Sequence, residues 1–267
     1  MMKALRGVLA FLCLSAMVLT TLPLAQAQKS VPPPSEPLSS GVPKDIYTRA
    51  KLHTELGSLY FQNGNLIVAL EELTIAISIN PNYAQAYSTR GLVLYYIKEW
   101  DSADKDFKKA LDLDGKDPEI SNNYGWFLCQ TGKEKESIAY FERAIKNPLY
   151  QTPESAYLNA GTCYIKMGDL ALAEEYVRKN LRFNRENPAA LFQLATISYK
   201  QGNYDAAKKH LTDVVSLSDP GSEVLWLFVR VSRRLKEEEA ESSFTAQLRR
   251  KFPDSPEYAE LLKGNFE

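Results

Sequence analysis

The chain has 267 residues, of which 45% are hydrophobic and 24% charged, and its formal net charge is −1. This composition is ordinary for a soluble helical protein. The near-neutral charge gives no electrostatic basis for binding nucleic acid or an anionic membrane, so those two classes of partner are excluded at this stage.

The first 27 residues have the layout of a cleavable signal peptide. Lys3 and Arg6 precede an apolar run over residues 8–22, and Ala25-Gln26-Ala27 has the small-x-small form of a signal-peptidase site. A membrane anchor is the alternative, but the run is short for a spanning helix and contains polar residues. Cleavage would remove two of the 32 basic residues and leave 30 against 33 acidic ones, a net charge of −3.

Residues 28–43 are rich in proline and carry almost no apolar side chains. We expect an extended, semi-rigid leader ahead of a folded region at 44–267. A lipid anchor is not predicted, because a lipoprotein signal needs a cysteine after a small residue at the end of the apolar run. Cys13 instead follows Leu12 in the middle of that run.

A period of about 34 residues then runs through the chain. Small residues recur at spacings of 34, 34, 36 and 34, at Gly57, Gly91, Gly125, Gly161 and Ala195. Each is followed by an aromatic residue or Leu, and later by a second small residue. The pattern predicts helix hairpins, because small residues let two helices approach closely. The predicted units are 50–83, 84–117, 118–151, 154–187, 188–221 and a degenerate sixth at 222–255, followed by a short capping helix at 257–263.

The first unit carries the signature most completely, with Leu56-Gly57 and Tyr60 in its first helix and Ala69, Leu73 and Ala76 in its second, ahead of Pro81. This arrangement resembles the tetratricopeptide repeat (TPR). The resemblance implies an all-α fold: a TPR solenoid, a right-handed superhelix of about six helix-turn-helix repeats plus a C-terminal capping helix. It also implies that the first helix of each repeat lines a concave groove.

The groove positions of the repeats are rich in aromatic and amide side chains. Aromatic rings offer large contact surfaces for apolar side chains, and amides can hydrogen-bond a peptide backbone. We therefore predict binding of an extended peptide or strand, although packing between repeats is the alternative role for each aromatic. Capture of a free carboxylate is disfavoured, because Thr54 and Ser58 stand where the clamp of chaperone-binding repeats needs Lys and Asn. The predicted protein-binding residues are Tyr95, Asn122, Asn123, Trp126, Gln130, Asn159, Thr162, Phe192 and Tyr199.

Two cysteines, Cys129 and Cys163, remain once the signal peptide is removed. Export would carry this even pair into an oxidising compartment, which favours a disulfide between them. Two buried free thiols are the alternative. A metal site is not predicted, because the chain has only His53 and His210 as further nitrogen ligands.

Catalytic motifs are not found in the sequence. It has no nucleophile elbow, no phosphate-binding loop, no His-Glu-x-x-His and no paired carboxylates that the pattern would bury. We therefore predict a non-enzymatic protein without cofactors or a small-molecule substrate. An exported hydrolase on a repeat frame is the competing class, and it would need clustered catalytic residues.

A narrower resemblance is carried by the third and fourth units. The segments Asn122-Asn123-Tyr124-Gly125-Trp126-Phe127-Leu128-Cys129, Asn147-Pro148-Leu149-Tyr150 and Asn159-Ala160-Gly161 are similar to the PilW/PilF family of type IV pilus biogenesis proteins. The resemblance implies a periplasmic protein at the inner face of the outer membrane that assists assembly of the pilus secretin, with the secretin or another pilus component as partner. Members of that family are typically lipoproteins, and this chain departs from them there. The alternative function is a periplasmic scaffold for another envelope or polysaccharide assembly system.

Overall fold

The computed structural model describes residues 45–266, so the predicted signal peptide and proline-rich leader lie outside the described residues. Within 45–266 the chain forms helices and no strand. The helices are α1 (Ile46–Gln62), α2 (Leu66–Ile79), α3 (Ala84–Tyr96), α4 (Trp100–Leu113), α5 (Pro118–Gln130), α6 (Glu134–Lys146), α7 (Pro153–Met167), α8 (Leu170–Asn180), α9 (Pro188–Lys200), α10 (Tyr204–Leu217), α11 (Ser222–Leu235), α12 (Glu238–Lys251) and α13 (Pro256–Lys263).

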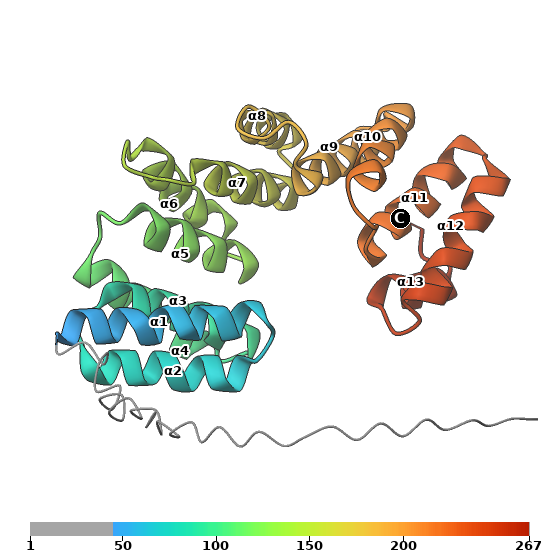
Figure 1. Ribbon diagram of the computed structural model, residues 1–267. Helices are drawn as coiled ribbons and strands as arrows, with labels where there is room; N and C mark the ends of the chain where they lie inside the picture. Colours follow the sequence, from blue (N-terminus) through green and yellow to red (C-terminus); the bar gives the residue numbers. More distant parts are fainter. Residues whose placement is uncertain (1–44, 267) are drawn as a thin grey trace, which may run out of the picture. The chain divides into compact units, whose positions relative to one another are not determined.

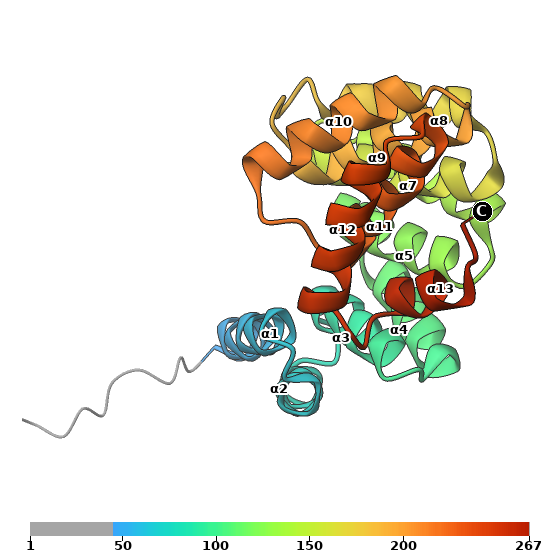
Figure 2. The same cartoon turned by 90° about the vertical axis from the view of Figure 1, so that its right-hand side faces the viewer.

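The first twelve helices form six hairpins (Figure 1), and the first and fourth begin ahead of the predicted units, at Ile46 and Pro153. We call the odd-numbered member of each hairpin its A helix and the even-numbered member its B helix. The sixth hairpin is complete although its sequence signature is degenerate: Val229 takes the place of the small residue and is fully buried. Helix α13 packs against α11 and caps the last repeat (Figure 2). The all-α TPR solenoid is confirmed.

The periodic small residues mark the points where the two helices of a hairpin touch. A Cβ atom added to Gly91 would lie 2.9 Å from the Phe107 ring, and one added to Gly125 would lie 2.9 Å from the Phe141 ring. Both phenylalanines are fully buried. The close approach of the A and B backbones therefore depends on the missing side chain, and a large B-helix residue fills the space instead.

The turn from A helix to B helix needs one residue with a left-handed backbone. Glycine supplies it in four repeats, as at Gly64 (φ 75°) and Gly132 (φ 83°). Repeats two and six use Lys98 (φ 67°) and Lys236 (φ 59°) at the equivalent position. A side chain with a Cβ atom costs free energy in this region, so these two turns are held by the packing of the helices on either side.

Two kinds of contact order the helix layers. Each B helix packs on the A helix of its own repeat and on the A helix of the next, whereas A helices also contact one another directly, from α1 with α3 to α9 with α11. Because the A helices lie nearer to their neighbours, they form the inner side of the curved stack. We call this inner side the A-helix surface.

An ion pair replaces an apolar contact in repeat two. Arg90 stands where the repeat usually has Leu, and its guanidinium donates to both carboxylate oxygens of Asp106 on α4, at 2.7 and 2.9 Å. The Asp106 residue is only 7% exposed. This charge-assisted, two-point contact joins the A and B helices of repeat two.

Candidate protein-binding surface

The first part of the candidate site is a group of four rings on three successive A helices, which we call the aromatic cluster. It consists of Phe61 on α1, Tyr95 and Tyr96 on α3, and Trp126 on α5. The ring centroids of Tyr95 and Trp126 are 4.7 Å apart in an edge-to-face contact, and Tyr96 stacks on Trp126 at 5.9 Å. Phe61 reaches Tyr96 at 5.3 Å.

The aromatic cluster remains open to solvent in part. Tyr96 is 52% exposed, and Phe61, Tyr95 and Trp126 are half-buried. Burial raises the pKa of the Tyr95 hydroxyl, with a further contribution from Tyr96, so this group stays a neutral donor at physiological pH. Three helices thus present one continuous aromatic surface that a partner side chain can cover.

The predicted amides serve mainly to join successive A helices. Asn123 Nδ2 donates to Ser88 Oγ at 3.3 Å, and Asn159 Nδ2 donates to Asn122 Oδ1 at 3.0 Å. Lys166 Nζ donates to Gln130 Oε1 at 2.6 Å. These bonds run from repeat two to repeat four along the A-helix surface, and we call them the polar ladder.

Asn122 corrects one expectation from the sequence. As a groove residue it was expected to be accessible, but it is only 6% exposed and is already bonded to Asn159. A polar group buried between two helices needs a partner there, and Asn159 supplies it for Asn122. Asn122 therefore shapes the surface from beneath.

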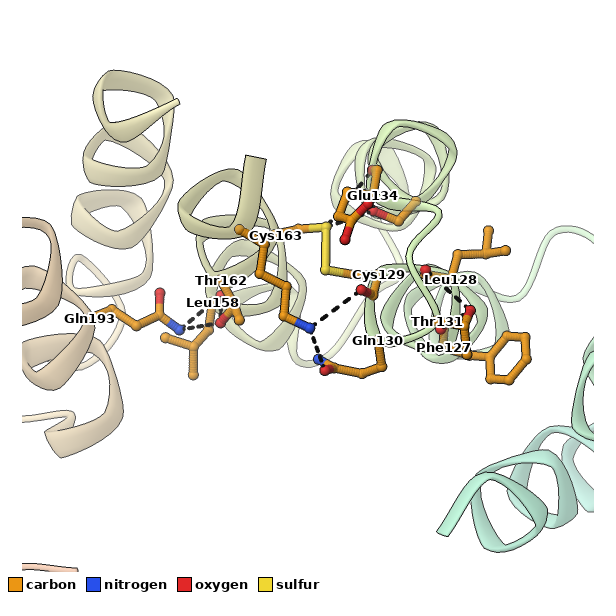
Figure 3. Close-up of a disulfide and its surroundings, with 12 residues drawn as sticks. Phe127, Leu128, Cys129, Gln130, Thr131, Glu134, Leu158, Thr162, Cys163 and Gln193 are labelled. Atoms are coloured by element: carbon orange, nitrogen blue, oxygen red, sulfur yellow. Dashed lines mark hydrogen bonds between the residues drawn. A yellow bond between two sulfur atoms is a disulfide. The ribbon is translucent and has the colours of Figure 1, made fainter. Parts of the chain in front are cut away.

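A disulfide joins the A helices of repeats three and four. It connects Cys129 on α5 with Cys163 on α7, whose Cα atoms are 5.9 Å apart (Figure 3). The cysteines are almost fully buried, at 1% and 0% exposure. Beside the bridge, the Gln193 amide of α9 donates to Thr162 Oγ1 at 2.6 Å and to Leu158 O at 3.2 Å, which extends the polar ladder to repeat five (Figure 3).

A cavity of about 460 Å³ opens along the first three repeats. Thr54 and Ser58 line it at the positions where a carboxylate clamp would need Lys and Asn. The charged side chains in its lining are acidic: Glu55, Asp117 and Glu119. Burial, and then the neighbouring Asp117, raises the pKa of Glu119. This lining repels a free carboxylate, in keeping with the expectation that a partner's C-terminus is not captured here.

The remaining two predicted residues, Phe192 and Tyr199, lie on α9 near the other end of the chain. Both line a second cavity of about 330 Å³, together with Trp226 and Arg230 of α11. The Tyr199 hydroxyl donates to the backbone oxygen of Phe266 at 3.3 Å. This part of the A-helix surface is thus in contact with the last described residues of the chain.

The two histidines stand apart from these surfaces. His53 Nδ1 lies 2.7 Å from Glu72 Oε2 across the first hairpin. His210 is half-buried, and desolvation lowers its pKa, assisted by Arg178 and Lys209. Among the described residues, no three His, Cys, Asp or Glu side chains converge on a point where a metal ion would fit. None of the helices in residues 45–266 has the length and apolar character that a membrane crossing requires.

Comparison with known families and structures identifies the chain. Tetratricopeptide repeat models match residues 50–83 and 88–155, and a model of anaphase-promoting complex subunit 3 matches residues 130–214. A crystal structure of PilW, described as a widely conserved type IV pilus biogenesis factor, superposes with a TM-score of 0.72 at 31% sequence identity. It covers 80% of this chain and 98% of PilW. The chain belongs to the PilW/PilF family.

Two further relatives agree with this membership. The type IV pilus assembly protein PilF of Pseudomonas aeruginosa is 29% identical over 209 residues, which cover 78% of this chain and 83% of PilF. A structure of Pseudomonas aeruginosa PilF superposes with a TM-score of 0.67 at 28% identity, over 80% of this chain and 97% of the other. This PilW/PilF member is therefore a non-enzymatic repeat protein of type IV pilus biogenesis.

Sequence reasoning missed two parts of the surface. Tyr96 is the most exposed ring of the aromatic cluster; it falls at a groove position of repeat two, directly after Tyr95, but was not among the predicted binding residues. Phe266 lies outside the repeats and carries no periodic signal. The sequence signal that could have identified Phe266 is an aromatic residue two positions after Gly264, which caps α13.

Proposed function

We propose that this PilW/PilF protein binds a protein partner on its A-helix surface and thereby supports assembly of the type IV pilus secretin in the outer membrane. The single observation that carries the proposal is the aromatic cluster. Four rings from three repeats form one partly exposed surface, and the exposed fraction of Tyr96 is 52%. Rings of this kind dominate the binding free energy of many protein interfaces.

The aromatic cluster offers contact surface, whereas the polar ladder holds the A helices together. This separation of roles supports binding through partner side chains. The polar ladder fixes the spacing of the A helices, so the aromatic cluster is held in place before a partner arrives. A surface that is ordered in advance loses little conformational entropy on binding. We infer that the partner offers apolar side chains to the rings, while its backbone runs across the neighbouring A helices.

The disulfide supports a location in the periplasm. Disulfides persist in oxidising compartments, and the periplasm is one of them. This agrees with the predicted cleavable signal peptide at residues 1–27. We propose that the protein acts at the inner face of the outer membrane, where a secretin would be assembled.

The test removes the rings and measures secretin assembly in cells. We expect Tyr96→Ala with Trp126→Ala to reduce secretin multimers in the membrane fraction to the level seen after deletion of the protein. Trp100→Ala is the matched control, because Trp100 begins the B helix α4 and is 54% exposed. Wild-type multimer levels in the double variant, at equal protein abundance, would refute the proposal.

A further inference from the structure

The last described residues of the chain fold back onto the A-helix surface of repeats five and six. Helix α13 ends at Gly264, whose φ of 71° turns the chain, and the Asn265 backbone N–H then donates to Glu260 O at 3.0 Å. Phe266 comes to lie against Tyr199 of α9 and Arg230 of α11, which are 67 and 36 residues away in the sequence.

Phe266 is bound through both its backbone and its ring. Its carbonyl oxygen accepts hydrogen bonds from the Tyr199 hydroxyl at 3.3 Å and from Arg230 Nε at 3.4 Å. Its ring centroid lies 5.5 Å from that of Trp226, and the guanidinium carbon of Arg233 lies 3.7 Å from the same ring centroid. One aromatic residue thus receives two donors, a ring contact and a cation–π contact.

The surface continues beyond the part that Phe266 covers. The adjacent cavity of about 330 Å³ is lined by Phe192, Trp226, Arg230 and Glu257, among others. The Glu257 Oε2 atom is buried and accepts no hydrogen bond from the described residues. A buried carboxylate oxygen without a donor is costly, so this position favours an incoming N–H group.

We propose that Tyr199, Trp226, Arg230 and Arg233 form a second peptide-binding site, the tail site, for an extended segment that carries an aromatic residue. Phe266 of the chain itself occupies the tail site until such a segment displaces it. This inference rests on the proposed function, because the displacing segment belongs to the protein partner. The tail shows the chemistry of the ligand, an aromatic ring with its own backbone carbonyl, and an N–H group of the incoming segment would satisfy Glu257 Oε2.

The segment after Gly264, the tail, can leave its site without unfolding a helix. Asn265 is exposed and bonds to Glu260 of α13, so Phe266 makes the contacts of this segment with the A-helix surface. Helix α13 keeps its own contacts with the last repeat through Tyr258 and Leu261 when the tail leaves. Opening of this segment breaks the contacts of Phe266 while the helices beneath it stay folded, so it is a local opening. A partner segment regains these contacts and adds those of the cavity.

The first experiment supplies the tail as a separate peptide. The probe is an acetylated peptide with the sequence of residues 262–267, added to a chain that ends at Gly264 and to the full chain, with binding followed by NMR shifts. A tethered tail competes at an effective concentration of the order of millimolar, so we expect the truncated chain to bind the peptide at least about fivefold more tightly. A peptide with Phe266→Ala should bind at least about fivefold more weakly, because it lacks the ring.

The second experiment examines the tail in its own chain. Acrylamide quenching of Trp226, isolated by difference from a Trp226→Phe form, should rise in Phe266→Ala and stay unchanged in Leu262→Ala, whose side chain is 71% exposed. Equal quenching in both variants would overturn the docking of the tail. Tyr199→Phe should weaken binding of the peptide by about threefold, because one hydrogen bond is lost.

The outcomes separate this inference from the proposed function. If the tail protects Trp226 but the truncated chain does not bind the peptide, the tail is a fixed cap and the exchangeable site is refuted. Secretin assembly that still depends on Tyr96 and Trp126 would then leave the proposed function intact. Peptide binding that persists while the aromatic cluster proves dispensable would refute the proposed function and leave the tail site standing.

Discussion

The two ends of the A-helix surface use aromatic residues in opposite ways. In repeats one to three, the rings of the aromatic cluster contact each other and Tyr96 remains 52% exposed. In repeats five and six, Trp226 is only 9% exposed and has the Phe266 ring against it. The same face of the same fold is thus open at one end and covered by the chain at the other. Under the proposed function, the open end is the part of the A-helix surface that a partner can contact without displacing the tail.

The largest expected effect is a loss of stability in the repeat that carries Tyr95 and Tyr96, at the open end of the A-helix surface. Gly91→Leu should destabilise the hairpin of repeat two by about 3 kcal/mol, because the new side chain meets the buried Phe107 ring. Helix α3 carries Tyr95 and Tyr96, so partner binding should fall with it. Thermal unfolding measures the effect. Gly221→Ala is the control, since an added Cβ there meets nothing within 4 Å; equal melting temperatures for the two variants would show that the repeat register is wrong.

The disulfide between repeats three and four stands between the two ends. Cys129→Ala with Cys163→Ala should lower the free energy of unfolding by about 3 kcal/mol, which lies within the range typical of native disulfides. The residues are 34 apart in the sequence. Chemical denaturation with and without a reducing agent checks this, because the reductant should destabilise the parent and leave the double variant unchanged. A parent that is insensitive to reductant would contradict the assignment.

The ion pair of repeat two is expected to matter somewhat less. Asp106→Asn should cost about 2 kcal/mol, because it leaves Arg90 without its charged partner in a largely buried position. Glu142→Gln is the control: Glu142 pairs with Lys146 on the surface, at 41% and 75% side-chain exposure, and should change stability by less than about 0.5 kcal/mol. Similar losses in both variants would mean that burial does not distinguish the two pairs.

The smallest expected effect lies outside both ends of the A-helix surface and depends on pH. His210 of α10 has a lowered pKa in the folded chain, because burial disfavours its charged form; Arg178 and Lys209 add to this, and Asp213 and Glu174 oppose it. The unfolded chain therefore takes up the proton first as the pH falls. The stabilisation from neutral His210 is present above the ordinary histidine pKa and is lost below it.

The free energy of unfolding of the parent should fall between pH 7.5 and pH 5.5. We expect this fall to be smaller in His210→Gln, by less than about 1 kcal/mol. Urea denaturation at the two pH values gives the slope. A steeper fall in the variant than in the parent would mean that His210 is protonated in the folded state and has the opposite sign of effect.

The sequence predicts the solenoid well because its repeat rests on local geometry. Gly91 and Gly125 mark helix contacts, and Gly64 and Gly132 mark turns, so the unit boundaries follow from spacing. The surface is harder to predict, since the same A-helix position can face a partner or the next repeat. Asn122 faces the next repeat, where it is bonded to Asn159. Phe266 reaches the surface only because the capping helix α13 packs on the last repeat. Neither arrangement has a periodic signal.

The most direct test of the central claim compares the two ends with one partner. Purified secretin should bind the chain with Tyr96→Ala and Trp126→Ala at least about tenfold more weakly than the parent, since two anchoring rings are lost. The chain truncated after Gly264 should bind it at least as tightly as the parent. Unchanged affinity in the double variant, measured by surface plasmon resonance with Trp100→Ala as reference, would contradict the account.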